Sequence, residues 1–258
     1  MSAATDATPP DTLRLRNLKK SFDKMAVDGL DLSIRPGEFY ALLGANGAGK
    51  TTTLRMVAGL LQPDSGEISI CGVDALRDPI AAKSQVAWLP DEPLLYDKLA
   101  PMEYLEFVAG LWGMKPDVAK SRAENLLRRL RLWDQRNERC EGFSRGMRQK
   151  VALAGALIHE PRLLMLDEPL TGLDAGASRQ VKDMLVEQAK AGVAIVLTTH
   201  ILEVAERMAD RIGIIAQGKK IAEGTLAELR GMANGLGAGA GASLEEVFLD
   251  LTARGEAA

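Results

Sequence analysis

The residues from 44 to 51 combine glycines, a lysine and a threonine at a spacing suited to holding phosphate groups. They read Gly44-Ala45-Asn46-Gly47-Ala48-Gly49-Lys50-Thr51, followed by Thr52, and fit the pattern G-x-x-x-x-G-K-[ST] at every fixed position. Glycines let a backbone approach phosphate closely, and a helix N-terminus offers unpaired N–H groups to an anion. We expect Lys50 to contact the β- and γ-phosphates of a nucleotide and Thr51 to offer its hydroxyl to Mg²⁺. The alternative is a glycine-rich turn with a surface lysine.

Two adjacent carboxylates, Asp167 and Glu168, form the second chemical signal. They end the apolar run Leu163-Leu164-Met165-Leu166, which is typical of a buried strand in a parallel sheet. Ligands of α/β proteins bind at the carboxyl edge of the sheet, so both side chains should lie there. We expect Asp167 to hold Mg²⁺, directly or through water, and Glu168 to act as the general base on the attacking water. The alternative is an acidic strand end that faces solvent.

Composition narrows the class of protein in which these residues act. Of the 258 residues, 47% are apolar and 26% are charged, which predicts a packed globular fold. The net charge of −3 argues against a nucleic-acid partner held by overall positive charge. No apolar run reaches the roughly 20 residues that span a bilayer, and the N-terminus lacks the features of a signal peptide. Cys71 and Cys140 have no metal-ligand spacing. We therefore expect reduced thiols, a cytoplasmic location and membrane contact only through a partner.

Apolar periodicity places the two motifs in a mixed fold. Alternating strands are expected at 13–18, 30–34 and 67–70, and continuous apolar strands at 39–43, 86–89, 163–166 and 194–198. Amphipathic helices are expected at 102–111, 118–132, 145–158 and 178–189, and a hairpin at 212–223. The prediction is an α/β fold: a P-loop NTPase core with a parallel sheet, an N-terminal antiparallel β subdomain and an inserted helical subdomain.

Composition also divides the chain into segments. They are a flexible tail (1–11), a nucleotide-binding domain (12–230) with the helical subdomain at about 92–160, a Gly/Ala linker (231–242), and a C-terminal helix with its tail (243–258). Ser243 and Glu246 fit a capping box at the start of that helix. Leu244, Val247 and Leu251 then follow the spacing of one apolar face.

The motifs, in their order from Phe22 to His200, resemble those of the nucleotide-binding subunit of an ATP-binding cassette (ABC) transporter. The resemblance covers nearly the whole chain apart from the first ten or so residues and the Gly/Ala linker. It implies ATP and Mg²⁺ as cofactors, with residues 44–52 around the phosphates and Phe22 stacked on the adenine, a role that suits an aromatic ring face.

The same resemblance assigns roles to the remaining site residues. It implies that Asp167 holds the metal, that Glu168 is the catalytic glutamate and that His200 contacts the γ-phosphate. Gly172-Leu173-Asp174 matches the loop that communicates across a dimer, which places Asp174 at a nucleotide site. His159, the other histidine, precedes Pro161 at a helix end and is interpreted as structural.

Two motifs depart from the family pattern. The signature Leu-Ser-Gly-Gly-Gln is replaced by Phe143-Ser144-Arg145-Gly146-Met147, which keeps Ser144 and Gly146 as expected contacts to the nucleotide of a partner chain. Arg145 adds bulk and charge where the family has glycine, so we expect looser dimer closure. Asp91 replaces the usual glutamine after Leu89-Pro90, and we expect it to reach Mg²⁺ through water.

The functional expectation is an ATPase subunit that drives a separate membrane permease from the inner face of the cell membrane. Two copies would stack head to tail, with each ATP between the phosphate loop of one chain and Ser144 of the other. The second subunit is either identical or a paralogue. The C-terminal helix and the variant signature resemble those of efflux-type cassettes, which favours export. No nucleic-acid partner is expected.

Two other classes remain as alternatives. A soluble cassette ATPase acting on ribosomes or DNA usually has two cassettes in one chain or a long coiled coil, and this chain has neither. A kinase or GTPase with a phosphate-binding loop would not explain the Ser144 element or His200. The transported substrate is left open.

The loop from Asp91 to Lys98 carries three large apolar residues among charged ones, Leu94, Leu95 and Tyr96. One interpretation is that they fold back over the core. The other is that they line a groove for a short helix of the permease.

Overall fold

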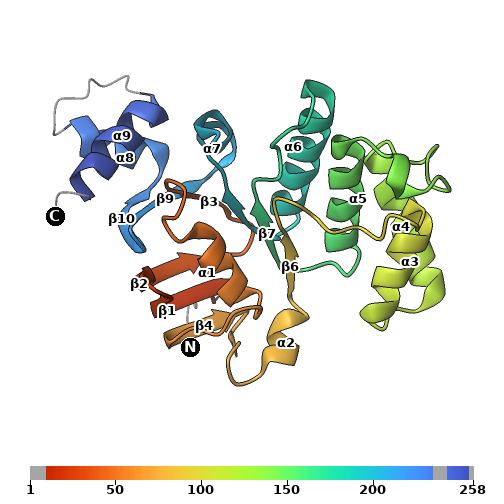
Figure 1. The fold of residues 1–258 in the computed structure, drawn as a ribbon, viewed down its shortest axis with the longest axis horizontal. Coiled ribbons are helices and arrows are strands. Elements are labelled where there is room, and N and C mark those ends of the chain that lie inside the picture. Colours follow the sequence, from red (N-terminus) through yellow and green to blue (C-terminus); the bar gives the residue numbers. More distant parts are fainter. Residues whose placement is uncertain (1–9, 235–242, 256–258) are drawn as a thin grey trace, which may run out of the picture.

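The computed structural model describes residues 10–234 and 243–255, which form two sheets and their covering helices (Figure 1). The larger sheet has the strand order β10-β9-β3-β8-β7-β6, and the smaller one β2-β1-β4-β5. The strands are β1 (Leu13–Ser21), β2 (Met25–Ile34), β3 (Phe39–Leu43), β4 (Ser65–Ile70), β5 (Val73–Asp74), β6 (Val86–Leu89), β7 (Leu163–Asp167), β8 (Ala194–Thr198), β9 (Arg211–Ala216) and β10 (Lys219–Gly224). The helices are α1 (Lys50–Val57), α2 (Pro79–Lys83), α3 (Pro101–Leu111), α4 (Pro116–Arg129), α5 (Arg145–Leu157), α6 (Ala175–Lys190), α7 (Leu202–Met208), α8 (Leu226–Asn234) and α9 (Leu244–Gly255).

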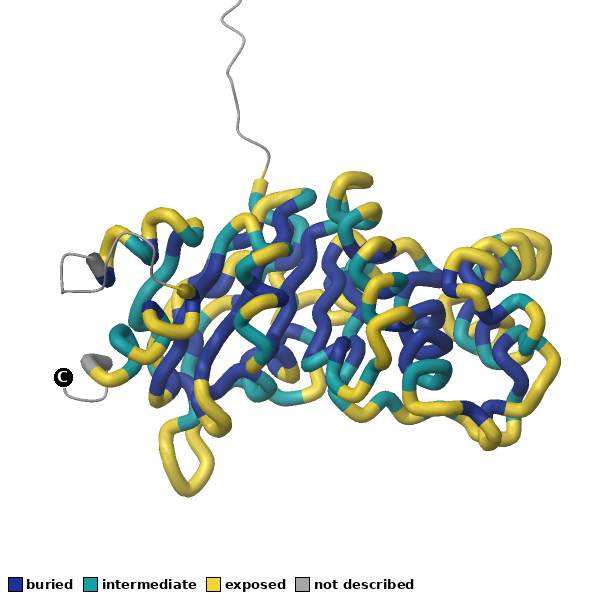
Figure 2. Tube along the Cα trace, turned by 90° about the horizontal axis from the view of Figure 1, so that it is seen from above, coloured by how far each residue is buried: buried dark blue, intermediate teal, exposed yellow. Residues whose placement is uncertain are grey.

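The parallel centre of the larger sheet explains the continuous apolar runs. β3, β7 and β8 are buried along their whole length, because helices cover both faces of a parallel sheet. Figure 2 shows these strands as the dark blue interior. Leu42 of β3 and Asp167 of β7 both pair with Thr198 of β8, so the carboxyl ends of the three strands are level. The loop after β3 and the carboxylates after β7 therefore meet at one edge, and the predicted fold class is confirmed.

Helix α1 lies between the two sheets (Figure 1). A single apolar cluster contains Leu13 and Ile34 of the smaller sheet, Leu54 and Met56 of α1, and Val196 of the larger sheet. This packing holds the loop before α1 from both sides.

The helical subdomain consists of α3, α4 and α5, as the periodicity predicts. Leu105, Leu127 and Leu153, one from each helix, are fully buried in one cluster. The cluster continues through Leu166 of β7 and Val181 of α6. Because α5 contacts both the other helices and the central sheet, it connects the subdomain to the nucleotide edge.

The C-terminal region corrects one predicted boundary. The Gly/Ala linker was placed at 231–242, but α8 runs to Asn234 and so includes its first four residues. Leu229 and Ala233 are fully buried, and this contact with the core, together with the good helix formers Met232 and Ala233, extends the helix past Gly231. The rest of the predicted linker, like most of the predicted tail, lies outside the described residues.

Other elements were predicted correctly or were missed. The capping box of α9 is present, since the Ser243 backbone N–H donates to the Glu246 carboxylate at 2.8 Å and the Glu246 N–H donates to Ser243 Oγ at 3.3 Å. β2 is five residues longer than expected, and α2, α7 and α8 were not predicted. Cys71 and Cys140 are free thiols. Among the residues that the structure describes, no helix is both long and apolar enough to cross a bilayer.

Candidate functional site

The phosphate-binding loop joins the buried strand β3 to α1, and its first and last glycines are fixed by neighbouring backbone. A Cβ atom on Gly44 would lie 2.5 Å from the Ile215 carbonyl oxygen, and one on Gly49 would lie 2.4 Å from the Ala26 carbonyl oxygen. Gly49 also has φ +107°, a conformation that only glycine adopts readily. A Cβ on Gly47 would meet nothing within 4 Å. Two of the glycines are thus required by contacts within the chain itself.

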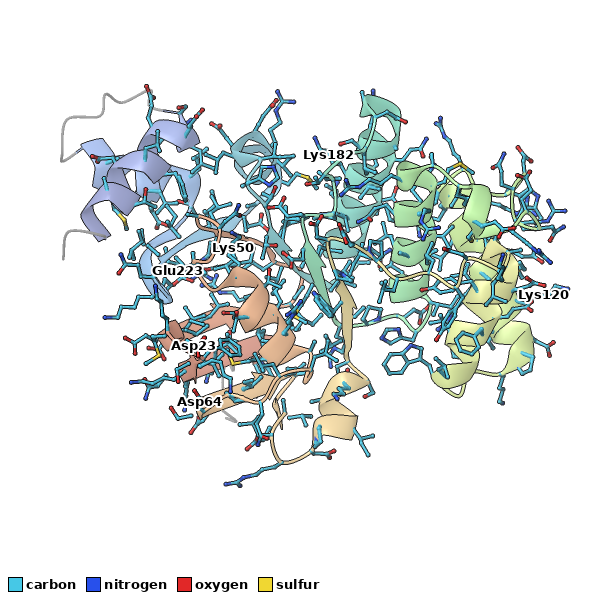
Figure 3. All side chains as sticks on the ribbon, viewed as in Figure 1. Asp23, Lys50, Asp64, Lys120, Lys182 and Glu223 are labelled. Carbon is cyan, nitrogen blue, oxygen red and sulfur yellow. The ribbon has the colours of Figure 1, made fainter. Side chains whose placement is uncertain are left out.

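Lys50 is the first residue of α1 (Figure 3), and its side chain points back into the loop. Its ammonium group donates to the carbonyl oxygens of Gly44 at 2.7 Å and Ala45 at 3.1 Å, and the residue is only 8% exposed. Burial lowers the pKa of Lys50, while the nearby carboxylates of Glu168 and Asp167 raise it. The loop therefore holds a sheltered cation whose present partners are backbone oxygens, which phosphate oxygens can replace.

The predicted metal ligands Thr51 and Asp167 are in direct contact. Thr51 Oγ1 donates to the Asp167 carboxylate at 2.8 Å, and Thr198 Oγ1 donates to its other oxygen. Asp167 is 5% exposed. A hydroxyl and a carboxylate are hard oxygen ligands of the kind that Mg²⁺ prefers, and Mg²⁺ usually completes its shell with phosphate and water. In the described part of the chain, no three acidic, histidine or cysteine side chains form a metal cluster.

Glu168 is surrounded by donors. His200 Nδ1 lies 2.8 Å from its Oε1, and the hydroxyls of Thr199 and Thr171 donate to its Oε2 at 3.2 and 3.4 Å. The Glu168 backbone has φ +50°, an uncommon conformation for a residue with a side chain, and its N–H donates to the Thr198 carbonyl at 3.0 Å. The structure thus brings together the predicted base and the predicted γ-phosphate contact, His200.

A second group of predicted site residues lies at the N-termini of α5 and α6. Ser144 caps α5 by accepting from the Met147 N–H at 3.3 Å, and Asp174 caps α6 by accepting from the Ala177 N–H at 2.7 Å. A Cβ atom on Gly146 would lie 3.6 Å from Ala177 and from Leu173, so the two helix starts are packed together. Among the described residues, no hydrogen bond or ion pair joins this group to Lys50, Asp167 or Glu168.

Phe22 lies in a separate turn, and Asp91 lies beside the N-terminus of α5. Phe22 is 60% exposed in the turn between β1 and β2, with Lys20 Nζ 5.7 Å from its ring centroid. Asp91 pairs with Arg145, its Oδ1 lying 3.6 Å from Arg145 Nη2. Its role as a metal ligand stays a prediction, and the contact with Arg145 was not anticipated.

The threonines around the carboxylates were missed as site residues. Thr198 ends β8 beside β7, Thr199 follows it directly, and both are buried. The signal was present in the sequence, because two threonines end an apolar strand next to a strand that ends in two carboxylates. Only the strand order, which the sequence does not state, makes them neighbours.

Comparison with known proteins identifies the family. Residues 27–171 match the family model described as ABC transporter. The linearmycin resistance ATP-binding protein LnrL of Bacillus subtilis (strain 168) is 36% identical over 218 residues, which cover 84% of this chain and 70% of that protein. The Nod factor export ATP-binding protein I of Cupriavidus metallidurans (strain ATCC 43123 / DSM 2839 / NBRC 102507 / CH34) is 39% identical over 218 residues, covering 84% and 72%.

A solved structure of similar fold supports the same assignment. It is described as the ATP binding subunit of an ABC transporter, with a TM-score of 0.86 and 36% identity, and covers 93% of this chain and 99% of its own. The chain therefore belongs to the ABC transporter family and is an ATPase of that family. The matches are with transporter subunits and do not favour the alternative of a soluble cassette acting on ribosomes or DNA.

Proposed function

We propose that this chain binds Mg²⁺-ATP at the edge formed by β3, β7 and β8, hydrolyses it together with a second ATPase subunit, and drives export through a separate membrane permease. The observation that carries the proposal is the convergence of three predicted elements at one sheet edge. These are the Lys50 loop, the Thr51–Asp167 pair and the Glu168–His200 pair.

The chain's own residues divide the chemistry between them. Lys50 and the N-terminus of α1 bind the phosphates, because both present positive charge to the same loop. Thr51 and Asp167 would hold the metal, which supplies charge neutralisation on the phosphates when bound. Glu168 accepts the proton of the attacking water, and His200 and Thr199 fix the orientation of its carboxylate.

The second group of residues suits the nucleotide of a second copy. The first turn of α5 contains no acidic residue and begins at Ser144, so its positive end is available to an anion. Since no hydrogen bond or ion pair of the described residues joins this group to the Lys50 group, we interpret them as two separate halves of a site. Stacking two chains head to tail would join the halves.

The permease would bind beside the loop after β6. A groove of about 520 Å³ is lined by Trp88, Leu94, Tyr104 and Trp112, among others. Leu94 is 93% exposed, and Tyr96 is 59% exposed with its ring 5.2 Å from that of Phe107 in an edge-to-face contact. Exposed apolar side chains next to a groove are typical of a site for an amphipathic helix.

Leu95 belongs to the other interpretation of this loop. It is partly buried against the core of the helical subdomain, so it covers that core rather than lining the groove. The three apolar residues thus divide: Leu95 supports the fold, and its two neighbours are free to contact a partner.

The relatives' names support export, since one is a Nod factor export protein and another a resistance protein. A cytoplasmic chain held at the inner face of the membrane by its permease fits both. The decisive experiment is purification of the tagged full chain from detergent-solubilised membranes. We expect a polytopic membrane protein to co-purify and to raise ATP turnover. Recovery of ribosomal proteins or DNA instead would refute the transport role.

A further inference from the structure

Arg145 and Asp91, two of the residues at which this sequence departs from the family pattern, contact each other. Arg145 Nη2 lies 3.6 Å from Asp91 Oδ1, and the two side chains are 54% and 48% exposed. Figure 1 shows the loop that carries Asp91 as a yellow trace running from β6 past α5 to α3. The departures are therefore one feature of the fold rather than two independent defects.

Arg145 also lies against the loop that follows β7 and contains Gly172. A Cβ atom built on Gly172 would be 3.0 Å from the Cδ, Nε and Nη1 atoms of Arg145. Gly172 has φ +75°, so glycine there serves both the turn and the close approach of the guanidinium. One side chain thus contacts the loop after β6 and the loop between Glu168 and Asp174.

The charge of α5 explains why the loop after β6 carries two aspartates, Asp91 and Asp97. The first turn of α5 contains Arg145 and Arg148 at the positive end of the helix, an unfavourable arrangement without counter-charge. Asp91 and Asp97, both from the same loop, supply it, with Arg148 Nη1 lying 2.6 Å from Asp97 Oδ1. Asp91 Oδ1 is sheltered from solvent and has no hydrogen bond, so Arg145 is its nearest compensation.

We propose that Asp91 and Arg145 are a positioning pair, which holds the loop before the permease groove against the loop that follows Glu168. The inference rests on the proposed function for its catalytic consequence only. Half-exposed ion pairs add little to global stability, so the role of the pair is to fix the relative position of two loops. In this arrangement Arg145 packs against two loops of its own chain.

A charge exchange in the full chain tests the pair. Asp91→Arg and Arg145→Asp each place like charges together, whereas the double variant restores the attraction with reversed sign. Without nucleotide, hydrogen–deuterium exchange of the segments 90–98 and 168–174 should rise at least fivefold in each single variant and return to within twofold of the wild type in the double variant. With ATP, kcat should follow the same pattern while KM and the melting temperature stay unchanged.

The charge-exchange variants also distinguish a positioning role of Asp91 from a role in metal binding. Arginine at position 91 cannot bind Mg²⁺, so recovery of kcat in the double variant excludes that role for Asp91. The milder Arg145→Gln variant should give an intermediate exchange rate and serves if a reversal prevents folding. The matched control exchanges Lys98, from the same loop, and Glu141, which lies just before α5. This pair is 2.7 Å apart, and its exchange should change neither the hydrogen exchange of the two segments nor kcat.

Two results would overturn the inference. One is a hydrogen–deuterium exchange rate equal to that of the wild type in both single variants. The other is a double variant whose exchange rate is as high as that of the faster-exchanging single variant. Failure of the proposed function is visible separately, as loss of ATP binding or turnover in the wild-type chain, because exchange is measured without nucleotide.

Discussion

Replacing Glu168 by glutamine separates ATP binding from hydrolysis. The Glu168 carboxylate lies 2.8 Å from His200 Nδ1 and accepts hydrogen bonds from Thr199 and Thr171. Glutamine keeps the length and planarity of the side chain but cannot take a proton from water. We expect kcat of Glu168→Gln to fall by about 10²–10⁴-fold, the usual contribution of a general base. That corresponds to about 2.7–5.4 kcal/mol of activation free energy.

The same substitution should leave ATP affinity equal to that of the wild type or raise it. Glu168 is one of two carboxylates close enough to influence Lys50 electrostatically, so its negative charge opposes the phosphates that Lys50 attracts. Removing one negative charge relieves that repulsion, and the dimer should accumulate with ATP bound. Phosphate release measures kcat, calorimetric titration with Mg²⁺-ATP measures Kd, and light scattering measures the dimer.

Glu203→Gln is the matched control for Glu168→Gln. Glu203 lies on α7, is well exposed and pairs with Arg207 at 2.8 Å, so its loss should change neither kcat nor Kd. A Glu168→Gln protein that turns over ATP within threefold of the wild-type rate would refute Glu168 as the base, whatever its affinity.

Three further predictions follow from the described contacts. Lys50→Ala should weaken ATP binding by about 10–100-fold, since a charge-assisted hydrogen bond contributes roughly 1.5–3 kcal/mol, and unchanged affinity in a titration would contradict the phosphate-loop assignment. Tyr96→Asp should reduce co-purification of the permease and leave the melting temperature unchanged. Leu95→Asp should lower the melting temperature, because Leu95 packs on the helical core. A Tyr96→Asp protein that keeps its partner would exclude this loop from the interface. Gly49→Ala should lower the free energy of unfolding by more than Gly47→Ala does. Both substitutions impose about 1–3 kcal/mol of backbone strain, but only Gly49 lacks room for a Cβ. Equal urea midpoints of the two variants would contradict that account.

Strands and site residues could be predicted from the sequence where a short local pattern depends on the whole fold. Residues 163–166 are apolar because both faces of β7 are covered, and the carboxylate that ends such a strand, Asp167, has to lie at the sheet edge. Lys50 follows from its motif for a similar reason, since the loop geometry is local.

The remaining features depend on contacts between distant segments. Thr198 donates to Asp167 only because β8 is the neighbour of β7, and strand order is set by packing of the whole sheet. α8 continues past Gly231 because Ala233 finds a buried position, which outweighs the low helical propensity of that glycine. Neither the strand order nor the burial of Ala233 produces a hydrophobic periodicity that could be recognised in the sequence.

The Asp91–Arg145 contact shows how this limit affects functional interpretation. Considered singly, Arg145 predicts a crowded interface and Asp91 predicts a weak metal ligand. Considered together, each side chain supplies the opposite charge to the other, which neither prediction took into account, and both stay predictions. A pattern of single positions cannot represent such compensation, since the family residues, glycine and glutamine, are both neutral. Departures from a motif should therefore be tested in pairs wherever the fold brings them within the reach of one arginine side chain.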